Sequence, residues 1–100
     1  MDIEFLYLEV CPSYPEARRL LGEVLAERGL DTTVQVREVT SQDEAEKLGF
    51  PGSPTIRVNG RDVDPVGASA RPALMCRIYR KPDGGVSPVP TREQLEAALS

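Results

Sequence analysis

The chain has 100 residues and a net charge of −4, with 40% apolar and 28% charged residues, which predicts one globular domain over residues 1–100. The acidic balance argues against nucleic acid and anionic membrane surfaces as partners, because both attract basic patches. No apolar run is long enough to span a membrane and the N-terminus lacks the basic residues of a secretory signal, so we expect a cytoplasmic protein.

The first third of the chain predicts a strand followed by a helix. Residues 3–10 are short, apolar and aromatic-rich, which is typical of a central strand buried on both faces. From Glu16 the apolar residues recur at helical spacing, and Gly29 is placed where a helix ends. Ser13 and Glu16 have the spacing of a capping box, which predicts the start of this helix.

A second strand and a second helix follow. Residues 32–39 alternate threonine and valine with polar residues, as a strand with one solvated face does. Ser41 and Glu44 have the spacing of another capping box, and Gly49 predicts the end of a short helix.

The middle of the chain predicts a β-hairpin and then a loop. Residues 55–58 and 61–64 flank Asn59-Gly60, the preferred pair for a two-residue hairpin turn. We interpret Asp62 and Asp64 as solubilising charges on an edge strand. Residues 65–75 have no clear period and are expected to form a surface loop.

The last quarter predicts an edge strand and a closing helix. Residues 76–80 alternate, which places Cys76 inward and Arg77 outward on a fifth strand. Thr91 and Gln94 predict a capped helix that closes the fold. The complete order is β-α-β-α-β-β-(β)-α, which is an α/β domain with a mixed sheet of four to five strands and flanking helices.

The composition points to sulfur as the carrier of any distinctive chemistry. The chain has no histidine, which excludes Ser-His-Asp and Cys-His catalysis and all histidine-containing metal sites. It has two cysteines, too few for a disulfide scaffold or a zinc site of four thiolates. No bound cofactor is expected.

Cys11 opens the motif Cys11-Pro12-Ser13-Tyr14, between the first strand and the first helix. A cysteine at a helix N-terminus is exposed to unsatisfied N–H groups and the positive end of the dipole, which favour the reactive thiolate. The alternative is that Cys11 is a small buried apolar residue. Tyr14 either donates a hydrogen bond to the thiolate or covers the core.

A second motif, Ser53-Pro54-Thr55, directly precedes the third strand. Together with the cysteine motif and the element order, it resembles the thioredoxin-like superfamily of thioredoxins and glutaredoxins. The chain is also similar to small thioredoxin-like bacterial proteins that combine Cys-Pro-x-aromatic with a later Cys-Arg-x-Tyr. The resemblance implies that Pro54 is a cis-proline beside Cys11. It also implies that Pro12, Ser53, Pro54 and Thr55 border the substrate.

The chain departs from the family at Tyr14, which replaces the second cysteine of Cys-x-x-Cys. Three uses of Cys11 remain open: monothiol exchange, oxidation to a sulfenic acid resolved by another thiol, and soft-metal binding with a second thiolate. Cys76 is the only internal second thiol, but sequence does not place it near Cys11. The alternative is that Cys76 is simply an inward-facing strand residue.

Three functions follow from these observations. The first is a monothiol oxidoreductase that uses Cys11 on protein or small-molecule thiols and disulfides. The second is a redox-inactive peptide-binding module with the same fold. The third is a mercury, arsenite or copper binder that uses Cys11 and Cys76. The edge strands are compatible with a monomer or a homodimer.

Overall fold

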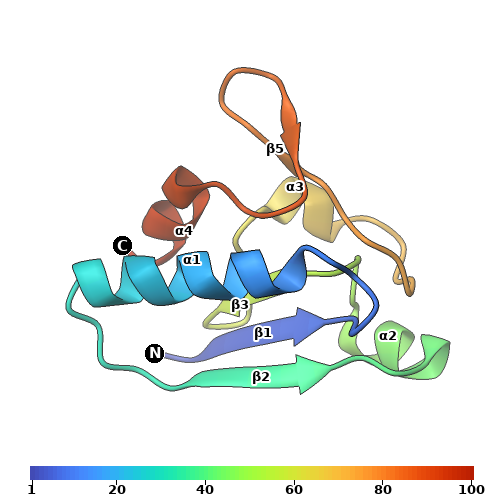
Figure 1. Ribbon diagram of the computed structural model, residues 1–100. Coiled ribbons are helices and arrows are strands. Elements are labelled where there is room, and N and C mark those ends of the chain that lie inside the picture. The colour runs from blue at the N-terminus through green and yellow to red at the C-terminus, as the bar shows by residue number, and fades with distance from the viewer.

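A mixed sheet of four strands organises the computed structural model, which describes residues 1–100 (Figure 1). The strand order is β2 (Val34–Glu38), β1 (Ile3–Tyr7), β3 (Thr55–Val58) and β4 (Arg61–Asp62). Strand β1 pairs parallel with β2 and antiparallel with β3, and β3 and β4 form a hairpin. The α/β class and the mixed sheet that the sequence predicts are therefore confirmed.

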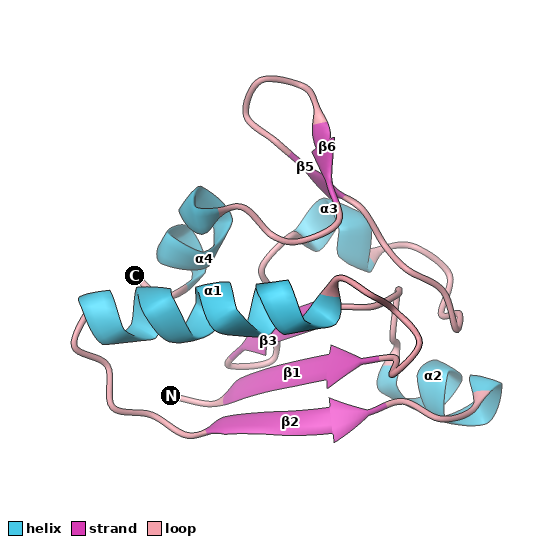
Figure 2. Ribbon diagram, in the orientation of Figure 1, coloured by secondary structure: helices cyan, strands magenta, loops and turns pink.

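Two helices pack on one face of this sheet and a third lies at its end (Figure 2). Helix α1 (Tyr14–Glu27) and helix α4 (Arg92–Ala98) pack on the face that carries Phe5, whereas α2 (Gln42–Leu48) lies at the end of the sheet on the other side. Successive side chains of a strand point to opposite faces, which is why β1 supplies residues to both layers. None of the helices combines the length and the apolar character that a membrane crossing needs.

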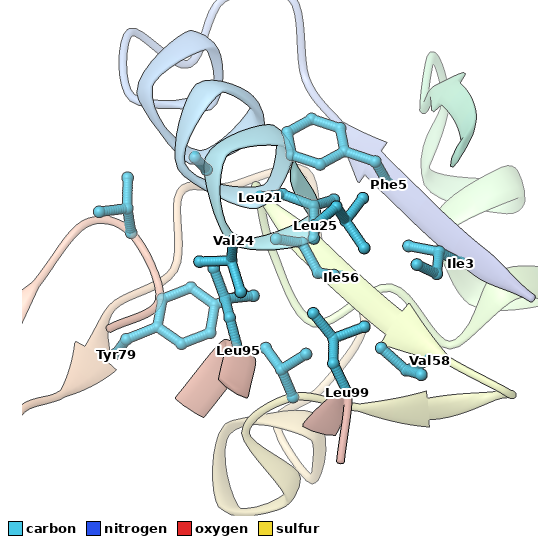
Figure 3. Close-up of a cluster of buried hydrophobic side chains, with 13 residues drawn as sticks. Ile3, Phe5, Leu21, Val24, Leu25, Ile56, Val58, Tyr79, Leu95 and Leu99 are labelled. Atoms are coloured by element: carbon cyan, nitrogen blue, oxygen red, sulfur yellow. The ribbon is translucent and has the colours of Figure 1, made fainter. Parts of the chain in front are cut away.

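The larger hydrophobic cluster lies between α1, α4 and the sheet (Figure 3). It joins apolar side chains that are almost completely buried, from four parts of the chain: Ile3, Phe5, Ala17, Leu21, Val24, Leu25, Ile56, Val58, Val63, Tyr79, Val89, Leu95 and Leu99. Because α4 has only seven residues, its position depends on this packing more than on helix propensity.

Replacing Leu95 by alanine is expected to lower the free energy of unfolding by about 2–5 kcal/mol, because its side chain is fully buried and leaves a cavity. Urea denaturation of the reduced protein measures this change. Val10, which is 88% exposed, provides the control: Val10→Ala should leave the midpoint nearly unchanged. Equal losses in both variants would contradict this description of the core.

A second, smaller cluster lies beneath α2 and contains Cys11. Leu6 and Leu8 reach it from the strand side, and Phe50, which precedes the third strand, is fully buried within it. Cys11 is thus packed among apolar side chains while belonging to the loop that leads into α1.

The predicted turn and two of the predicted caps form. Asn59 and Gly60 both adopt positive φ, 52° and 80°, as a type I′ hairpin turn requires. Ser41 accepts a hydrogen bond from the Glu44 N–H, and Thr91 forms a complete capping box at α4. Ser13 is the N-cap residue of α1, but its side chain forms no capping hydrogen bond. The capping box predicted from Ser13 and Glu16 is therefore wrong.

The region after β4 departs from the prediction. The expected loop 65–75 begins with a short helix, α3 (Pro65–Ala68), capped by Asp64. The expected fifth strand is reduced to β5 (Tyr79–Arg80), which pairs with β6 (Val86–Ser87) in a separate two-stranded sheet. Figure 1 shows this hairpin extending away from the main sheet. Cys76 instead forms an isolated parallel bridge with Ser53.

Candidate functional site

Cys11 lies in the turn between β1 and α1. Strand β1 ends at Tyr7, earlier than predicted, and the Cys11 N–H donates to the carbonyl of Leu8 at 3.1 Å. The Cys11 sulfur lies 3.2 Å from the Ser13 hydroxyl and 3.6 Å from the Ser53 carbonyl, to which it donates as a thiol. Only 1% of Cys11 is exposed. Its position at the helix start and its burial are therefore both realised, although they were alternatives in the sequence.

The second thiol lies directly against the first. The Sγ atoms of Cys11 and Cys76 are 2.8 Å apart, and both cysteines are free. A disulfide bond is about 2.05 Å long, so this is a contact between reduced thiols. Cys76 is exposed, whereas Cys11 is buried. The prediction that Cys76 faces inward as a strand residue is wrong.

The backbone of Ser53 holds Cys76 in this position. The Ser53 N–H donates to the Met75 carbonyl at 2.8 Å, and the Ser53 carbonyl accepts from the Arg77 N–H at 3.0 Å. The chain approaches Gly52 so closely that a Cβ there would lie 2.8 Å from the Arg77 Cβ. Gly52 also has a φ of +137°, which side chains rarely allow. Residues 75–77 are thus paired with the turn that precedes β3.

The same turn is tied to residues 77–79 on its other side. The bond from Ser53 to Pro54 is cis, and the Tyr79 hydroxyl donates to the Pro54 carbonyl. Thr55 donates to the Gly52 carbonyl and accepts from the Arg77 guanidinium at 3.1 Å. Ser53, Pro54 and Thr55 are all buried, so they bind the Cys76 segment and not solvent.

Arg77 is buried, contrary to the outward orientation expected from the sequence. Its guanidinium forms two hydrogen bonds with the Asp62 carboxylate, at 2.9 and 3.2 Å, and both side chains are 5% exposed. The guanidinium also lies over the ring of Tyr79, 4.3 Å from its centroid. Asp62 is therefore an internal ion-pair partner, and Asp64 is also buried. The interpretation of both as solubilising charges is wrong.

The two thiols differ in acidity because of their contact. Burial raises the pKa of Cys11, but hydrogen bonds from Cys76 and from the Ser13 side chain and backbone outweigh it, so the pKa lies below its ordinary value. The hydrogen bond to Cys11, together with burial, raises the pKa of Cys76. The pair therefore holds its first negative charge on Cys11 while Cys76 keeps its proton.

Tyr14 does not form the expected hydrogen bond to the thiolate. Its hydroxyl donates to the Glu9 carboxylate at 3.2 Å, and its ring stacks on Tyr7 with 4.4 Å between centroids. Pro12 is exposed on the loop between Cys11 and the helix. The groups that stabilise the Cys11 thiolate are Cys76, Ser13 and, to a smaller extent, Ser53.

The separation of the two sulfurs lies between the values for a disulfide and for two thiolates on one metal ion, so the number of available ligands is what argues for the disulfide. Two thiolates on one tetrahedral zinc, with bonds of about 2.3 Å, lie about 3.8 Å apart, so Cys11 and Cys76 would have to separate by about 1 Å. No group of three or more histidine, cysteine, aspartate or glutamate side chains is arranged to hold a metal ion. A disulfide requires a similar shift in the opposite direction.

A cavity of about 310 Å³ opens beside Cys76. Its lining includes the apolar side chains of Val66, Met75 and Ile78, together with Cys76 and Arg77. A larger hollow of about 910 Å³ lies between β4, α4 and residues 80–82, and no cysteine lines it. The smaller cavity is therefore the one connected with the thiols.

The sequence does not predict the Arg77–Asp62 ion pair or the two backbone hydrogen bonds that join Ser53 to Met75 and Arg77. The only signal in the chain is the glycine at position 52, which indicates a close backbone approach without naming its partner. In comparisons with protein-family models, curated proteins and solved structures, the chain has no significant match.

Proposed function

We propose that the protein is a thiol–disulfide oxidoreductase in which Cys11 and Cys76 form the redox pair. The observation that carries the proposal is the 2.8 Å contact between one buried and one exposed sulfur. A structural cysteine pair in a core has no need of an exposed member or of a lowered pKa, and both occur here. The pair replaces the single reactive thiol that the sequence suggested.

A thioredoxin-like fold is part of this proposal. Three features support it: a helix joining the parallel strands β1 and β2, an antiparallel β3–β4 hairpin on the other side of β1, and a cis-proline directly before β3. Cys11 contacts Ser53, the residue bonded to that proline. In place of the second cysteine of a Cys-x-x-Cys motif, the chain brings Cys76 from a segment 65 residues away.

The different exposures of the two thiols support one order of chemical steps. An external disulfide reaches Cys76 first, because Cys11 lies beneath it. As Cys76 attacks, its proton passes to Cys11 and one substrate thiolate leaves, so that a mixed disulfide forms on Cys76. Cys11 then gives up the proton and attacks the Cys76 sulfur. The second substrate thiol departs with that proton, and the Cys11–Cys76 disulfide remains.

Monothiol exchange at Cys11 is less compatible with these contacts. A reagent reaches Cys11 only after residues 75–77 have left Ser53, which breaks both backbone hydrogen bonds to that residue. Cys76 is exposed and is therefore the thiol that meets the substrate, whereas the sequence alone suggested Cys11 for this role and Cys76 as the resolving thiol.

Oxidised dithiothreitol or diamide is expected to convert the reduced protein quantitatively into a monomer that lacks two hydrogens by mass. Peptide mapping without reduction should join Cys11 to Cys76. The reason is that a disulfide needs the sulfurs to approach by less than about 1 Å.

Cys11→Ser and Cys76→Ser are the matched controls, and each should abolish the intramolecular product. If the wild-type protein instead forms only intermolecular disulfides or higher oxidation states, Cys11 and Cys76 are not a redox pair.

A further inference from the structure

The segment that carries Cys76 has one paired edge and one open edge. Met75 and Arg77 are hydrogen-bonded to Ser53 in an isolated parallel bridge centred on Cys76, and in such a bridge the backbone groups of Cys76 itself are directed to the opposite side. The backbone N–H and C=O groups of the alternate residues Leu74, Cys76 and Ile78 have no hydrogen-bond partner within the chain. These three residues therefore present an open strand edge, centred on the exposed thiol.

Apolar side chains surround this edge. Leu74, Met75 and Ile78 are exposed, and so is Val66, which lines the same cavity as Cys76. They are four of the eight large apolar side chains that the whole surface exposes. A monomeric protein usually scatters such residues singly, so their concentration around one thiol indicates a contact surface.

The charge around the edge is opposite to that of the whole chain. Residues 65–82 contain four of the 12 basic residues and none of the 16 acidic ones. Arg77 is neutralised by Asp62, but Arg71, Arg80 and Lys81 are exposed. A protein with net charge −4 thus has exposed positive charge near its accessible thiol in the sequence, and Arg80 lines the same cavity as Cys76, which favours an acidic partner.

We propose that the open edge of residues 74–78 binds an extended polypeptide segment of a partner protein, rich in apolar and acidic residues, and places that segment's cysteine sulfur against Cys76. This inference names the substrate class and rests on the proposed oxidoreductase function. The substrate strand adds to the edge already formed by residues 75–77 on Ser53, with main-chain hydrogen bonds on both sides of Cys76. Its acidic residues face Arg71 and Arg80, and its apolar residues cover Met75 and Ile78.

Mixed disulfides of thionitrobenzoate with short peptides test this surface. One peptide has the sequence Asp-Leu-Val-Cys-Val-Leu-Asp, a second has lysine in place of both aspartates, and N-acetylcysteinamide serves as the small neutral reference. Cys76 attacks the peptide sulfur and thionitrobenzoate leaves. Cys11 then attacks Cys76 and the peptide thiol leaves, so that each reaction ends in the Cys11–Cys76 disulfide. Release of thionitrobenzoate gives the rate.

The acidic peptide should react about tenfold faster than the lysine peptide at low ionic strength, and the difference should shrink in high salt. N-methylation of the two valines next to its cysteine removes strand pairing and should cancel its advantage over the reference. Arg80→Glu should reverse the preference between the charged peptides. Arg18→Glu, on the exposed side of α1, is the matched control and should leave all rates unchanged.

The outcomes separate this inference from the function on which it rests. If all three reagents yield the Cys11–Cys76 disulfide at equal rates, the docking surface is refuted and the oxidoreductase function stands. If none yields that disulfide, the function itself fails. Cosedimentation with phosphatidylserine vesicles, without preference for the acidic peptide, would assign the patch to a membrane. Dimerisation that Ile78→Asp abolishes, again without that preference, would assign it to a second copy of the chain. Either of these two results overturns the inference.

Discussion

Replacing Asp62 by alanine is expected to lower the free energy of unfolding by about 3–5 kcal/mol, because it leaves the Arg77 guanidinium charged and without its partner in a site that is 5% exposed. In a domain of this size such a loss lowers the melting temperature by roughly 12 °C or more. Denaturant titration of the reduced protein, followed by circular dichroism, measures the change. The effect is large because the partner left behind is an ion, whose desolvation is no longer compensated.

An exposed ion pair provides the control for this prediction. Glu23→Ala removes the partner of Arg19, whose side chain is 62% exposed, and should change stability several-fold less. The double variant Asp62→Leu with Arg77→Met removes both charges, so it should recover part of the loss. If Asp62→Ala is no more destabilising than Glu23→Ala, the Arg77–Asp62 pair does not anchor the segment.

Replacing Cys76 by alanine is expected to raise the pKa of the Cys11 thiol and to abolish the intramolecular disulfide completely. The S–H of Cys76 donates to the Cys11 sulfur and stabilises the thiolate, so its removal leaves burial, which favours the thiol, less opposed. Ultraviolet absorbance of the thiolate against pH measures the shift without requiring a reagent to reach Cys11. The buried thiol should titrate at a higher pH in the variant than in the wild-type protein.

The lowered pKa of Cys11 also makes the stability of the folded protein depend on pH. Because the pKa of Cys11 is lower in the folded than in the unfolded state, its ionisation contributes stability above the unfolded pKa, and this contribution is lost as the pH falls through the folded value. Cys76→Ala should weaken that dependence.

The reverse variant completes the test of the thiol pair. Cys11→Ala should lower the pKa of Cys76, because the hydrogen bond and the negative charge that raise it are gone. A Cys11 titration that Cys76→Ala leaves unchanged would assign thiolate stabilisation to Ser13 and Ser53 instead.

Local patterns predicted most of the fold because each depends on neighbouring residues. Asn59-Gly60 determines a hairpin turn by its backbone preferences, and the capping residues of α2 and α4 act within one helical turn. The position of Cys11 before α1 follows in the same way. The cis-proline was predicted from the resemblance of the Ser53-Pro54-Thr55 motif, and it is present.

The composition of the site could not be predicted in this way. Cys76 reaches Cys11 through pairing between Ser53 and residues 75–77, and no short-range preference determines that contact. Alternation alone placed Arg77 in solvent. The segment is not a strand of the main sheet, so the orientation depends instead on Asp62, on the neighbouring hairpin. A charged residue such as Arg77 is predicted to be exposed unless its ion-pair partner is known, and its partner Asp62 lies 15 positions away in the sequence.

The contact between the two sulfurs also determines how the molecule responds to mechanical tension. With the thiols reduced, a pull on the two ends can extend all 100 residues, to a length of roughly 350 Å. With a Cys11–Cys76 bond in place, only the ten residues before Cys11 and the 24 after Cys76 are free to lengthen, roughly 120 Å in total. Strands β1, β5 and β6 and helix α4 then unravel at the ends while β2, β3 and β4 remain enclosed in the covalent ring. The two-electron oxidation of the cysteine pair thus determines whether the whole chain, or only its two terminal segments, can extend under tension.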